Sequence, residues 1–334
     1  MKSYHLTTAG EAFALQLGEY PQPQPGPGQV RVRVRACSLN YRDLLVRQGR
    51  YGKRTEGLVP LSDGAGEVEA VGDGVQGVRP GDRVAGCFFQ GWPSGPFTAA
   101  VMDTALGGAR DGMLAEAVIL EAEGVIPLPA HLSWAEAACL PCAGLTAWNA
   151  LVTRGGLQPG TTVLLQGTGG VSIFALQFAV ALGARVILLS SSDAKLERGR
   201  ILGAAQTLNY HTHPDWEQEV WKLTEKRGVD HIVEVGGNLE KSLRCLAAGG
   251  HIAQVGVLGG GSGATNLFPL AMKNARLDGI YVGSRADFAA MNQLLNTHQL
   301  HPVIDRIFSF TQATEAYDHL ASGSHFGKVV IEIP

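Results

Sequence analysis

The strongest constraint on the fold of this chain is residues 162–172, Thr-Val-Leu-Leu-Gln-Gly-Thr-Gly-Gly-Val-Ser. An apolar strand, 162–166, runs into a glycine-rich turn, and the turn opens an apolar helix over 171–182. A second apolar strand follows at 185–189. This order lets backbone N–H groups and a helix N-terminus face a diphosphate. The stretch therefore predicts a strand–helix–strand unit that binds a dinucleotide.

Strand and helix patterns alternate from residue 162 to residue 282. The expected strands are 162–166, 185–189, 206–208, 230–235, 250–255 and 277–282, and the expected helices are 171–182, 194–202, 214–227 and 239–246. Such alternation predicts an α/β domain of the Rossmann type, a doubly wound parallel sheet with helices on both faces.

The first part of the chain has short strands separated by Pro/Gly-rich breaks. Val30, Val32 and Val34 alternate with arginines, which predicts a half-exposed strand over 30–35. Further strands are expected at 67–71, 83–85, 115–120 and 125–128. Short strands at this spacing predict a compact barrel or sandwich.

Two more helical regions complete the expected organisation. Ser133 and Glu136 form a capping box that opens a helix over 134–153, with Pro141 as a break. Near the end of the chain, helices at 289–296 and 312–321 and a strand at 328–333 return to the first domain. We expect one domain from 1–128 with 285–334, and a nucleotide-binding domain from 129–284.

Composition excludes several classes of protein. The 334 residues include 17% charged residues with a net charge of −3 and no basic tract, which argues against a nucleic-acid ligand. Residues 1–17 lack the apolar core of a signal peptide. The longest apolar stretch, 171–189, contains Gln177, Gly183 and Arg185, so it does not predict a membrane span. Five cysteines, an odd number, indicate free thiols and a cytoplasmic location.

The second expected strand ends in serine rather than in an acid. An Asp or Glu there would accept hydrogen bonds from a ribose 2′-OH and would repel a 2′-phosphate. Ser190, Ser191 and Ser192 supply hydroxyl groups instead, and Lys195 adds a positive charge, so the loop predicts NADP(H) rather than NAD(H). Asp193 opposes this prediction unless it is the N-cap or a first-turn acid of the next helix. A capping loop that binds no ligand is the alternative.

The glycine turn departs from the usual fingerprint because Ser172 stands where a third glycine is expected. A turn needed only for tight strand–helix geometry is therefore an alternative. Glycines also follow two later strands, at Val235-Gly236 and Val255-Gly256, and ligands bind at such strand ends. Tyr210 is either a contact of the adenosine phosphate or a surface tyrosine. The residues predicted to contact the cofactor are Gly167, Thr168, Gly169, Gly170, Val171, Ser190, Ser191, Ser192, Lys195, Tyr210, Val235, Gly236, Val255 and Gly256.

Five motifs occur in an order that spans the chain: Asn40-Tyr41-Arg42-Asp43, 60–66 (Pro-Leu-Ser-Asp-Gly-Ala-Gly), 144–148 (Gly-Leu-Thr-Ala-Trp), the turn at 167–172, and 326–330 (Phe-Gly-Lys-Val-Val). On these motifs the chain resembles the medium-chain dehydrogenase/reductase superfamily, most of all its zinc-free, quinone-oxidoreductase-like branch. The resemblance implies a GroES-like barrel that carries the substrate site, an inserted Rossmann domain, and a homodimer formed across the Rossmann sheet edges.

The resemblance also implies which residues replace a catalytic zinc site. By motif, the three ligand positions of zinc-dependent members fall on Asn40, Ser62 and Cys142. Asparagine and serine are poor zinc ligands, and a tetrahedral catalytic site needs three good ones. We therefore expect no metal. Cys139 and Cys142 have redox-motif spacing, but around Pro141 two buried structural thiols are the favoured interpretation.

Further site residues follow from the resemblance. Asn40 and Tyr41 are placed beside the nicotinamide, Tyr51 is presented to the substrate, and Thr146 lies at the nicotinamide end. The closing motif adds Phe326 and Lys328 to the cofactor contacts. Asn40-x-x-Asp43 also has a structural explanation, with Asn40 as a helix N-cap and Asp43 in the first turn.

The main functional hypothesis is an NADPH-dependent reductase of quinones or α,β-unsaturated carbonyl compounds. The Tyr51 hydroxyl, or Asn40 acting through water, would stabilise the developing enolate or quinolate oxygen, with Tyr41 beside the nicotinamide. An alcohol dehydrogenase is one alternative, although it needs a Lewis acid or a strong general acid to polarise a plain carbonyl. An NADPH-binding redox sensor with little catalysis is the other.

Overall fold

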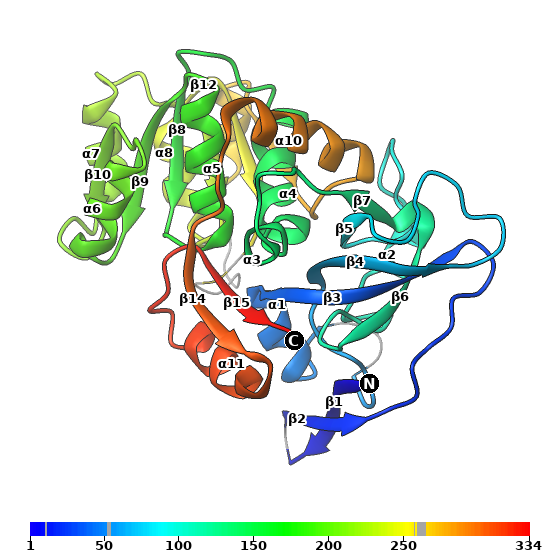
Figure 1. Cartoon of the computed structure of the whole chain (residues 1–334). Coiled ribbons are helices and arrows are strands. Elements are labelled where there is room, and N and C mark those ends of the chain that lie inside the picture. Colours follow the sequence, from blue (N-terminus) through cyan, green and yellow to red (C-terminus); the bar gives the residue numbers. More distant parts are fainter. Residues whose placement is uncertain (11, 52–54, 257, 259–264) are drawn as a thin grey trace. The chain divides into compact units, whose positions relative to one another are not determined.

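The computed structural model describes residues 1–334 except 11, 52–54, 257 and 259–264. It divides into two compact units, Met1–Leu145 with Ser284–Pro334, and Thr146–Gly283 (Figure 1). Residues 129–145, which the sequence analysis assigned to the nucleotide-binding domain, lie in the first unit.

The second unit contains a six-stranded parallel sheet in the order β10-β9-β8-β11-β12-β13. This is the doubly wound order of dinucleotide-binding folds, and it confirms the Rossmann prediction. The strands are β8 (Thr162–Gln166), β9 (Arg185–Ser190), β10 (Gln206–Asn209), β11 (Val229–Glu234), β12 (Leu246–Gln254) and β13 (Arg276–Gly279).

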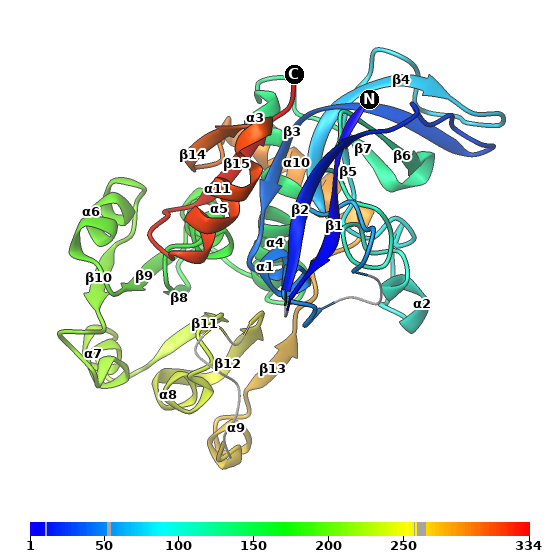
Figure 2. The same ribbon diagram turned by 90° about the horizontal axis from the view of Figure 1, so that it is seen from below.

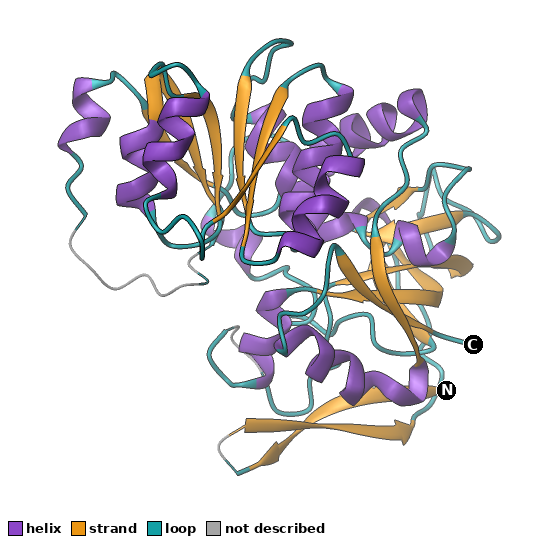
Figure 3. Ribbon diagram, turned by 90° about the vertical axis from the view of Figure 1, so that its left-hand side faces the viewer, coloured by secondary structure: helices purple, strands orange, loops and turns teal. Residues whose placement is uncertain are grey.

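Helices lie on both sides of this sheet (Figure 3). They are α5 (Gly170–Ala181), α6 (Asp193–Ile201), α7 (Trp216–Leu223), α8 (Leu239–Cys245) and α9 (Phe268–Met272). Because both faces are covered, Val163, Leu164 and Leu165 are all completely buried, as a continuous apolar run predicts for a parallel strand. Leu164 packs in one core with residues of α7 such as Trp216 and Val220.

The first unit is built on a mixed sheet in the order β14-β15-β3-β4-β5-β7, with β6 also pairing with β3. Its strands are β3 (Gln29–Leu39), β4 (Asp63–Val71), β5 (Arg83–Gly86), β6 (Ala117–Glu121), β7 (Val125–Pro127), β14 (Ile304–Ser309) and β15 (Lys328–Glu332). The valines of β3 are buried and its arginines partly exposed, as predicted. β15 lies antiparallel to β3 (Figure 1). This pairing brings the first of the five sequence motifs, which directly follows β3, close to the last, which includes the start of β15.

Several elements of the first unit were absent from the sequence analysis. β1 (Lys2–Ala9) and β2 (Ala12–Glu19) form a hairpin (Figure 2), and α2 (Ala99–Met102) and β14 are also new. The other helices are α1 (Tyr41–Arg47), α3 (Trp134–Ala137), α10 (Arg285–His298) and α11 (Ala313–Ala321), with single turns η1 (Ala122–Gly124) and η4 (Phe310–Gln312).

The helical region at 134–153 continues where a break was expected. Ser133 and Glu136 form the predicted capping box. Pro141 lies within a wide turn, η2 (Leu140–Gly144), which leads into α4 (Leu145–Trp148) and a second wide turn, η3 (Asn149–Thr153). Widened turns accommodate the missing N–H of a proline without ending the helix.

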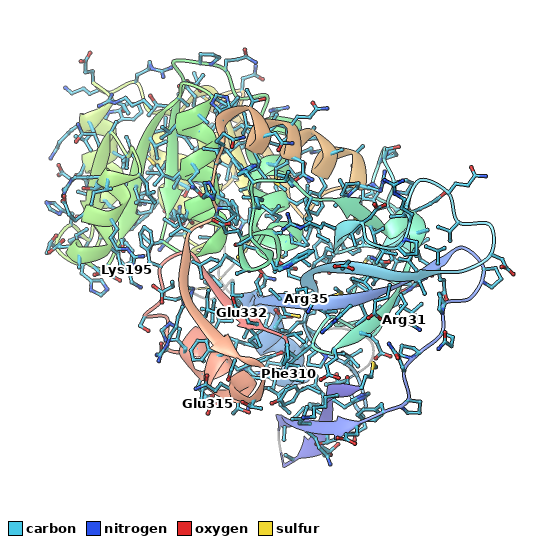
Figure 4. All side chains as sticks on the ribbon, in the orientation of Figure 1. Arg31, Arg35, Lys195, Phe310, Glu315 and Glu332 are labelled. Carbon is cyan, nitrogen blue, oxygen red and sulfur yellow. The ribbon has the colours of Figure 1, made fainter. Side chains whose placement is uncertain are left out.

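An apolar core fills the first unit between its sheet and α11. Within it the rings of Tyr4 and Phe310 meet edge to face, with centroids 5.1 Å apart. Phe310 and Glu315, which are labelled in Figure 4, belong to η4 and α11. Burial, with a smaller contribution from the Glu315 carboxylate, raises the pKa of Tyr4. Among the described residues, no helix has both the length and the apolar character needed to cross a membrane.

Candidate active site

The turn between β8 and α5 has the geometry expected of a phosphate-binding loop. Gly167 has a φ of 74°, which favours glycine, and α5 begins after Gly169 without a side-chain cap. The Ser172 hydroxyl donates to the Gln166 carbonyl at 2.6 Å. This hydrogen bond explains how serine replaces the third glycine, because its hydroxyl folds back onto the end of the strand. The N–H groups at the start of α5 therefore have no side-chain acceptor from the helix itself.

The serine loop after β9 divides into structural and exposed hydroxyl groups. Ser190 is buried, and its hydroxyl accepts from the Ser192 N–H at 3.3 Å. The Ser192 hydroxyl accepts from the Lys195 N–H at 3.4 Å and so caps α6. Ser191 is exposed. Lys195, labelled in Figure 4, lies in the first turn of α6.

The acid that opposed the NADP(H) prediction lies in the first helical turn. Asp193 is the first residue of α6, and its carboxylate accepts from Asn209 Nδ2 at 2.8 Å. Tyr210 follows β10, donates its backbone N–H to the Ser190 carbonyl at 3.1 Å and is 36% exposed. This position matches the interpretation of Asp193 as a first-turn acid, because a negative charge is favourable near a helix N-terminus.

The glycines after β11 and β12 lie at neighbouring strand ends. The Val255 and Gly256 N–H groups lie 2.9 and 3.3 Å from the Glu234 carbonyl oxygen. β8 is the neighbour of β11, and the strand order reverses between them. The predicted contacts at Gly167, Val235 and Gly256 therefore follow adjacent strands β8, β11 and β12 of one sheet. Thr146 is buried in α4 of the same unit.

In the first unit, Asn40 and Lys328 form a buried polar cluster with Asp63. The Lys328 ammonium donates to Asn40 Oδ1 and to the Leu39 carbonyl, both at 2.6 Å. The same ammonium lies 3.9 Å from Asp63 Oδ2, and the two side chains are 2% and 0% exposed. A buried charge is costly unless it is paired and hydrogen-bonded, and here both conditions are met.

The Asp63 carboxylate gathers further donors. Oδ1 accepts from the Ser62 hydroxyl at 2.7 Å, and Oδ2 accepts from the Cys142 N–H at 3.1 Å. Burial raises the pKa of Asp63, while the Lys328 ammonium acts against that rise. Leu61, two residues earlier, has a φ of 69°, a strained conformation for a branched residue that directs the chain into β4.

A second buried ion pair lies at the start of α1. Asp43 Oδ2 accepts from the Asn40 N–H at 2.8 Å, and Oδ1 accepts from Arg42 Nη1 at 3.1 Å. Arg42 Nη1 also donates to the Leu106 carbonyl at 3.0 Å. Burial raises the pKa of Asp43 to about 6, although Arg42 and the Asn40 N–H lower it.

Asn40 occupies the N-cap position of α1, and its backbone N–H donates to the Asp43 carboxylate in a capping box. A lysine ammonium has only donors, so the amide atom that faces Lys328 must be the oxygen. Asn40 Nδ2 is therefore the opposite donor, and it is buried without a hydrogen-bond partner among the described residues. The Asn40 side chain also interacts with the Asp63 carboxylate and acts against the rise in the pKa of Asp63.

The three remaining predicted residues of this unit lie in different surroundings. Tyr41 is the first residue of α1 and is 49% exposed. Tyr51 packs against a small apolar cluster that includes Val46, and its ring centroid lies 4.9 Å from the Arg42 guanidinium carbon. Phe326 is buried and donates its backbone N–H to Asp305 Oδ1 at 3.0 Å.

The side chains at the three expected zinc-ligand positions do not suit zinc. Asn40 Oδ1 is bound to Lys328, and the Ser62 hydroxyl donates to Asp63. Burial raises the pKa of the Cys142 thiol, which disfavours the thiolate that binds metals. Over the described ranges, no group of three His, Cys, Asp or Glu residues is arranged to hold a metal ion.

Sequence reasoning missed the residues that hold the others in place. Asp63 and the buried partner role of Lys328 depend on contacts between distant segments, which no local pattern reveals. Glu234 and Gln166, which hydrogen-bond to each other at the ends of β11 and β8, were missed as well. The available signal was an acid at the end of an apolar strand, immediately before Val235-Gly236-Gly237.

Two family models match the chain in the order of its units. Residues 26–130 match the alcohol dehydrogenase GroES-like domain, and residues 170–297 match the zinc-binding dehydrogenase family. With the sheet order of the second unit, these matches define a two-part α/β oxidoreductase and confirm the predicted fold class.

Individual relatives agree with this class. A zinc-type alcohol dehydrogenase-like protein of Schizosaccharomyces pombe is 43% identical over 307 residues, 89% of each chain. Quinone oxidoreductase-like protein 2 of Bos taurus is 30% identical, over 89% of this chain and 83% of the bovine one. The crystal structure of a putative alcohol dehydrogenase from Sinorhizobium meliloti superposes with a TM-score of 0.94 at 43% identity, over 99% and 98% of the two chains.

The chain belongs to the medium-chain dehydrogenase/reductase superfamily, among its zinc-type alcohol dehydrogenase-like and quinone oxidoreductase-like members. Binding of a nicotinamide cofactor is typical of these oxidoreductases.

We predict that Lys328→Met destabilises the protein by about 3–5 kcal/mol, because it leaves the Asp63 carboxylate buried without a cation. Lys328→Met combined with Asp63→Asn should recover most of the loss, since no unpaired charge remains. Chemical denaturation of both variants measures the difference. The control is Lys222→Met, which removes an exposed partner of Glu219 and should leave stability unchanged. Equal stability of Lys328→Met and Lys222→Met would contradict the prediction.

Proposed function

We propose that this chain is an NADPH-dependent reductase that transfers hydride to quinones or α,β-unsaturated carbonyl compounds without a catalytic zinc. The observation that carries the proposal is the buried cluster of Asn40, Asp63 and Lys328, in which Asn40, one of the three expected zinc-ligand positions, is hydrogen-bonded to a fixed ammonium. The bovine relative named quinone oxidoreductase-like supports the substrate class.

Bound NADPH supplies the hydride in this reaction. When a C–H bond forms at the β-carbon of an enone, the π electrons move to the carbonyl oxygen, and the resulting enolate then takes a proton from water. Asn40 Nδ2 is the donor we assign to that oxygen, because Lys328 binds the amide through Oδ1 and so fixes the position of Nδ2. Tyr51 remains a proposed substrate contact, and Tyr41 a proposed neighbour of the nicotinamide.

The cofactor contacts are proposals that follow the strand ends of the second unit. The turn at Gly167, Thr168, Gly169, Gly170 and Val171 would hold the diphosphate at the start of α5. Ser191, Lys195 and Tyr210 are the proposed contacts of the 2′-phosphate, with Ser190 and Ser192 shaping their loop. Val235, Gly236, Val255, Gly256 and Thr146 would serve the nicotinamide half. Phe326 and Lys328, the two closing-motif residues, are both buried, which favours indirect roles in cofactor binding. Lys328 would act through its hydrogen bond to Asn40.

The second unit also offers a surface for the proposed homodimer. β13 is an edge strand of the sheet, and an unpaired strand edge is a template for pairing. α9 precedes it and exposes Phe268 by 66% and Met272 by 70%. We propose that two copies associate through β13 and α9. Free thiols at all five cysteines support the proposed cytoplasmic location.

We predict that purified protein oxidises NADPH with members of a panel of quinones and enones at millimolar concentration or below. Asn40→Asp should lower kcat by about 100-fold, because removing one oxyanion donor has an effect of that order, while the Kd for NADPH stays within about twofold. Absorbance at 340 nm follows the turnover.

Two results in this assay would favour the alternatives. Turnover of simple alcohols together with stoichiometric zinc in the protein would indicate an alcohol dehydrogenase. Tight NADPH binding without turnover of any quinone or enone would indicate a redox sensor.

We predict a preference for NADPH over NADH that depends on Lys195. Lys195→Ala should weaken NADPH binding by about tenfold, through loss of a charge-assisted contact, and should change NADH binding by less than about twofold. Ser191→Asp should shift the preference toward NADH, because a carboxylate repels the 2′-phosphate. Titration of cofactor fluorescence measures the NADPH and NADH affinities of the wild type and of both variants. A wild-type protein that binds NADH more tightly would refute the assignment.

We predict that the protein sediments as a dimer and that Phe268→Glu with Met272→Glu converts it to a monomer, because the added charges would be buried in the proposed interface. Ile201→Glu is the matched control, since Ile201 is an exposed apolar residue of α6, away from β13. Analytical ultracentrifugation distinguishes the states. Dimers that persist in the double variant would place the interface elsewhere.

A further inference from the structure

The carboxylate of Glu234 lies at the end of β11 and is completely buried. Its Oε2 accepts from Gln166 Nε2 at 2.7 Å and from the Ser242 hydroxyl. Its Oε1 accepts from the N–H groups of Gly236 and Gly237, both at 2.9 Å. A weaker contact from the Asn238 N–H at 3.4 Å completes the set. The side chain therefore turns back onto the backbone that follows its own strand.

Within the described part of the chain, the donors to this carboxylate are all neutral groups. Among the residues that the structure describes, Glu234 takes part in no ion pair, so its hydrogen bonds must offset the loss of hydration. Hydrogen bonds to a charged acceptor are about twice as strong as neutral ones. Glu234 therefore holds the turn at Gly236 and Gly237 more firmly than a neutral side chain would.

Gln166 connects this turn to the phosphate-binding loop. Its Nε2 donates to Glu234, and its Oε1 accepts from the Gly236 N–H at 3.2 Å. A Cβ atom at Gly236 would lie 2.7 Å from Gln166 Oε1, so only glycine permits this approach. Gln166 is the last residue of β8 and directly precedes Gly167. The two strands that it joins, β8 and β11, are those between which the strand order reverses.

The network continues to the next strand end. The Glu234 carbonyl oxygen accepts from the Val255 N–H at 2.9 Å, and the Leu258 N–H donates to the Val235 carbonyl at 3.0 Å. Backbone groups after β11 and β12 are thus fixed relative to one another and to Gly167. Ser242, in α8, anchors the carboxylate from the helix that follows.

We propose that Gln166, Glu234 and Ser242 are positioning residues that set the backbone at 235–237 for the nicotinamide half of the cofactor. This inference rests on the proposed function. In a doubly wound sheet each half binds one mononucleotide, so the adenosine half lies over β8, β9 and β10 and the other half over β11 and β12. Disturbing the network should therefore affect one half of the cofactor and spare the other.

Glu234→Gln tests this separation. The amide places an NH2 group where Gln166 Nε2 and Ser242 donate, or where the backbone N–H groups donate, so one set of hydrogen bonds is lost. We expect NADPH affinity to fall by about tenfold, whereas affinity for 2′,5′-ADP, which lacks the nicotinamide half, stays within about twofold. Calorimetry with NADPH and with 2′,5′-ADP gives the ratio of the two affinities. A loss of overall rigidity would weaken both ligands together.

Two variants provide the control and the rescue. Glu217→Gln changes another buried glutamate of the same unit, one that pairs with Lys241 and Arg244, and should leave the ratio unchanged. Gln166→Glu combined with Glu234→Gln restores one carboxylate and one amide, and should recover most of the NADPH affinity. If Glu234→Gln does not fold, Ser242→Ala removes a single donor and should weaken NADPH alone by about threefold.

The outcomes separate this inference from the proposed function. A wild-type protein that binds 2′,5′-ADP and NADPH, with a Glu234→Gln variant that keeps the same affinity ratio, overturns the positioning role only. A wild-type protein that binds neither ligand overturns the proposed function as well. Failure of the double variant to recover affinity above Glu234→Gln also counts against the network.

Discussion

The buried ammonium of Lys328 determines the polar interior of the first unit. It needs acceptors because it has left water, and it finds them in Leu39, Asn40 and Asp63. Leu39 is the last residue of β3, Asn40 directly precedes α1, and Asp63 is the first residue of β4. A single ammonium therefore fixes the positions of these three elements. The orientation of the Asn40 amide follows from that arrangement, and with it the direction of its unpaired donor.

The second unit contains a buried anion, the Glu234 carboxylate, where the first unit contains a buried cation. Glu234 has no cationic partner among the described residues and depends on N–H and O–H donors instead. Those donors come from the end of β8, from the turn after β11 and from α8. In both units, then, a charged side chain away from water organises the backbone around it.

Sequence patterns predicted the strands in which the local order of apolar and polar residues determines which side chains are buried. The continuous apolar run of β8 and the alternation of β3 were sufficient to predict both strands, because local residues determine which faces are covered. β14 was missed because its residues are mostly exposed and show no alternation. The sequence analysis singled out Ser190 and Asn40 as polar residues near motifs, and both remain proposed site residues. Their actual hydrogen bonds depend on Ser192 and Lys328, and in the second case on a partner 288 residues away.

That separation has a consequence for synthesis of the protein. β15 supplies Lys328 and pairs with β3, so the first unit cannot close its polar interior until the intervening chain has emerged. At about 5–20 residues per second, translation of 288 residues takes on the order of tens of seconds. During that time Asp63 and Asn40 lack the Lys328 ammonium. The parallel sheet of the second unit, whose residues lie between Asp63 and Lys328 in the sequence, is already complete. The order of emergence therefore lets the second unit mature first, and the first unit completes its polar interior only when β15 has emerged.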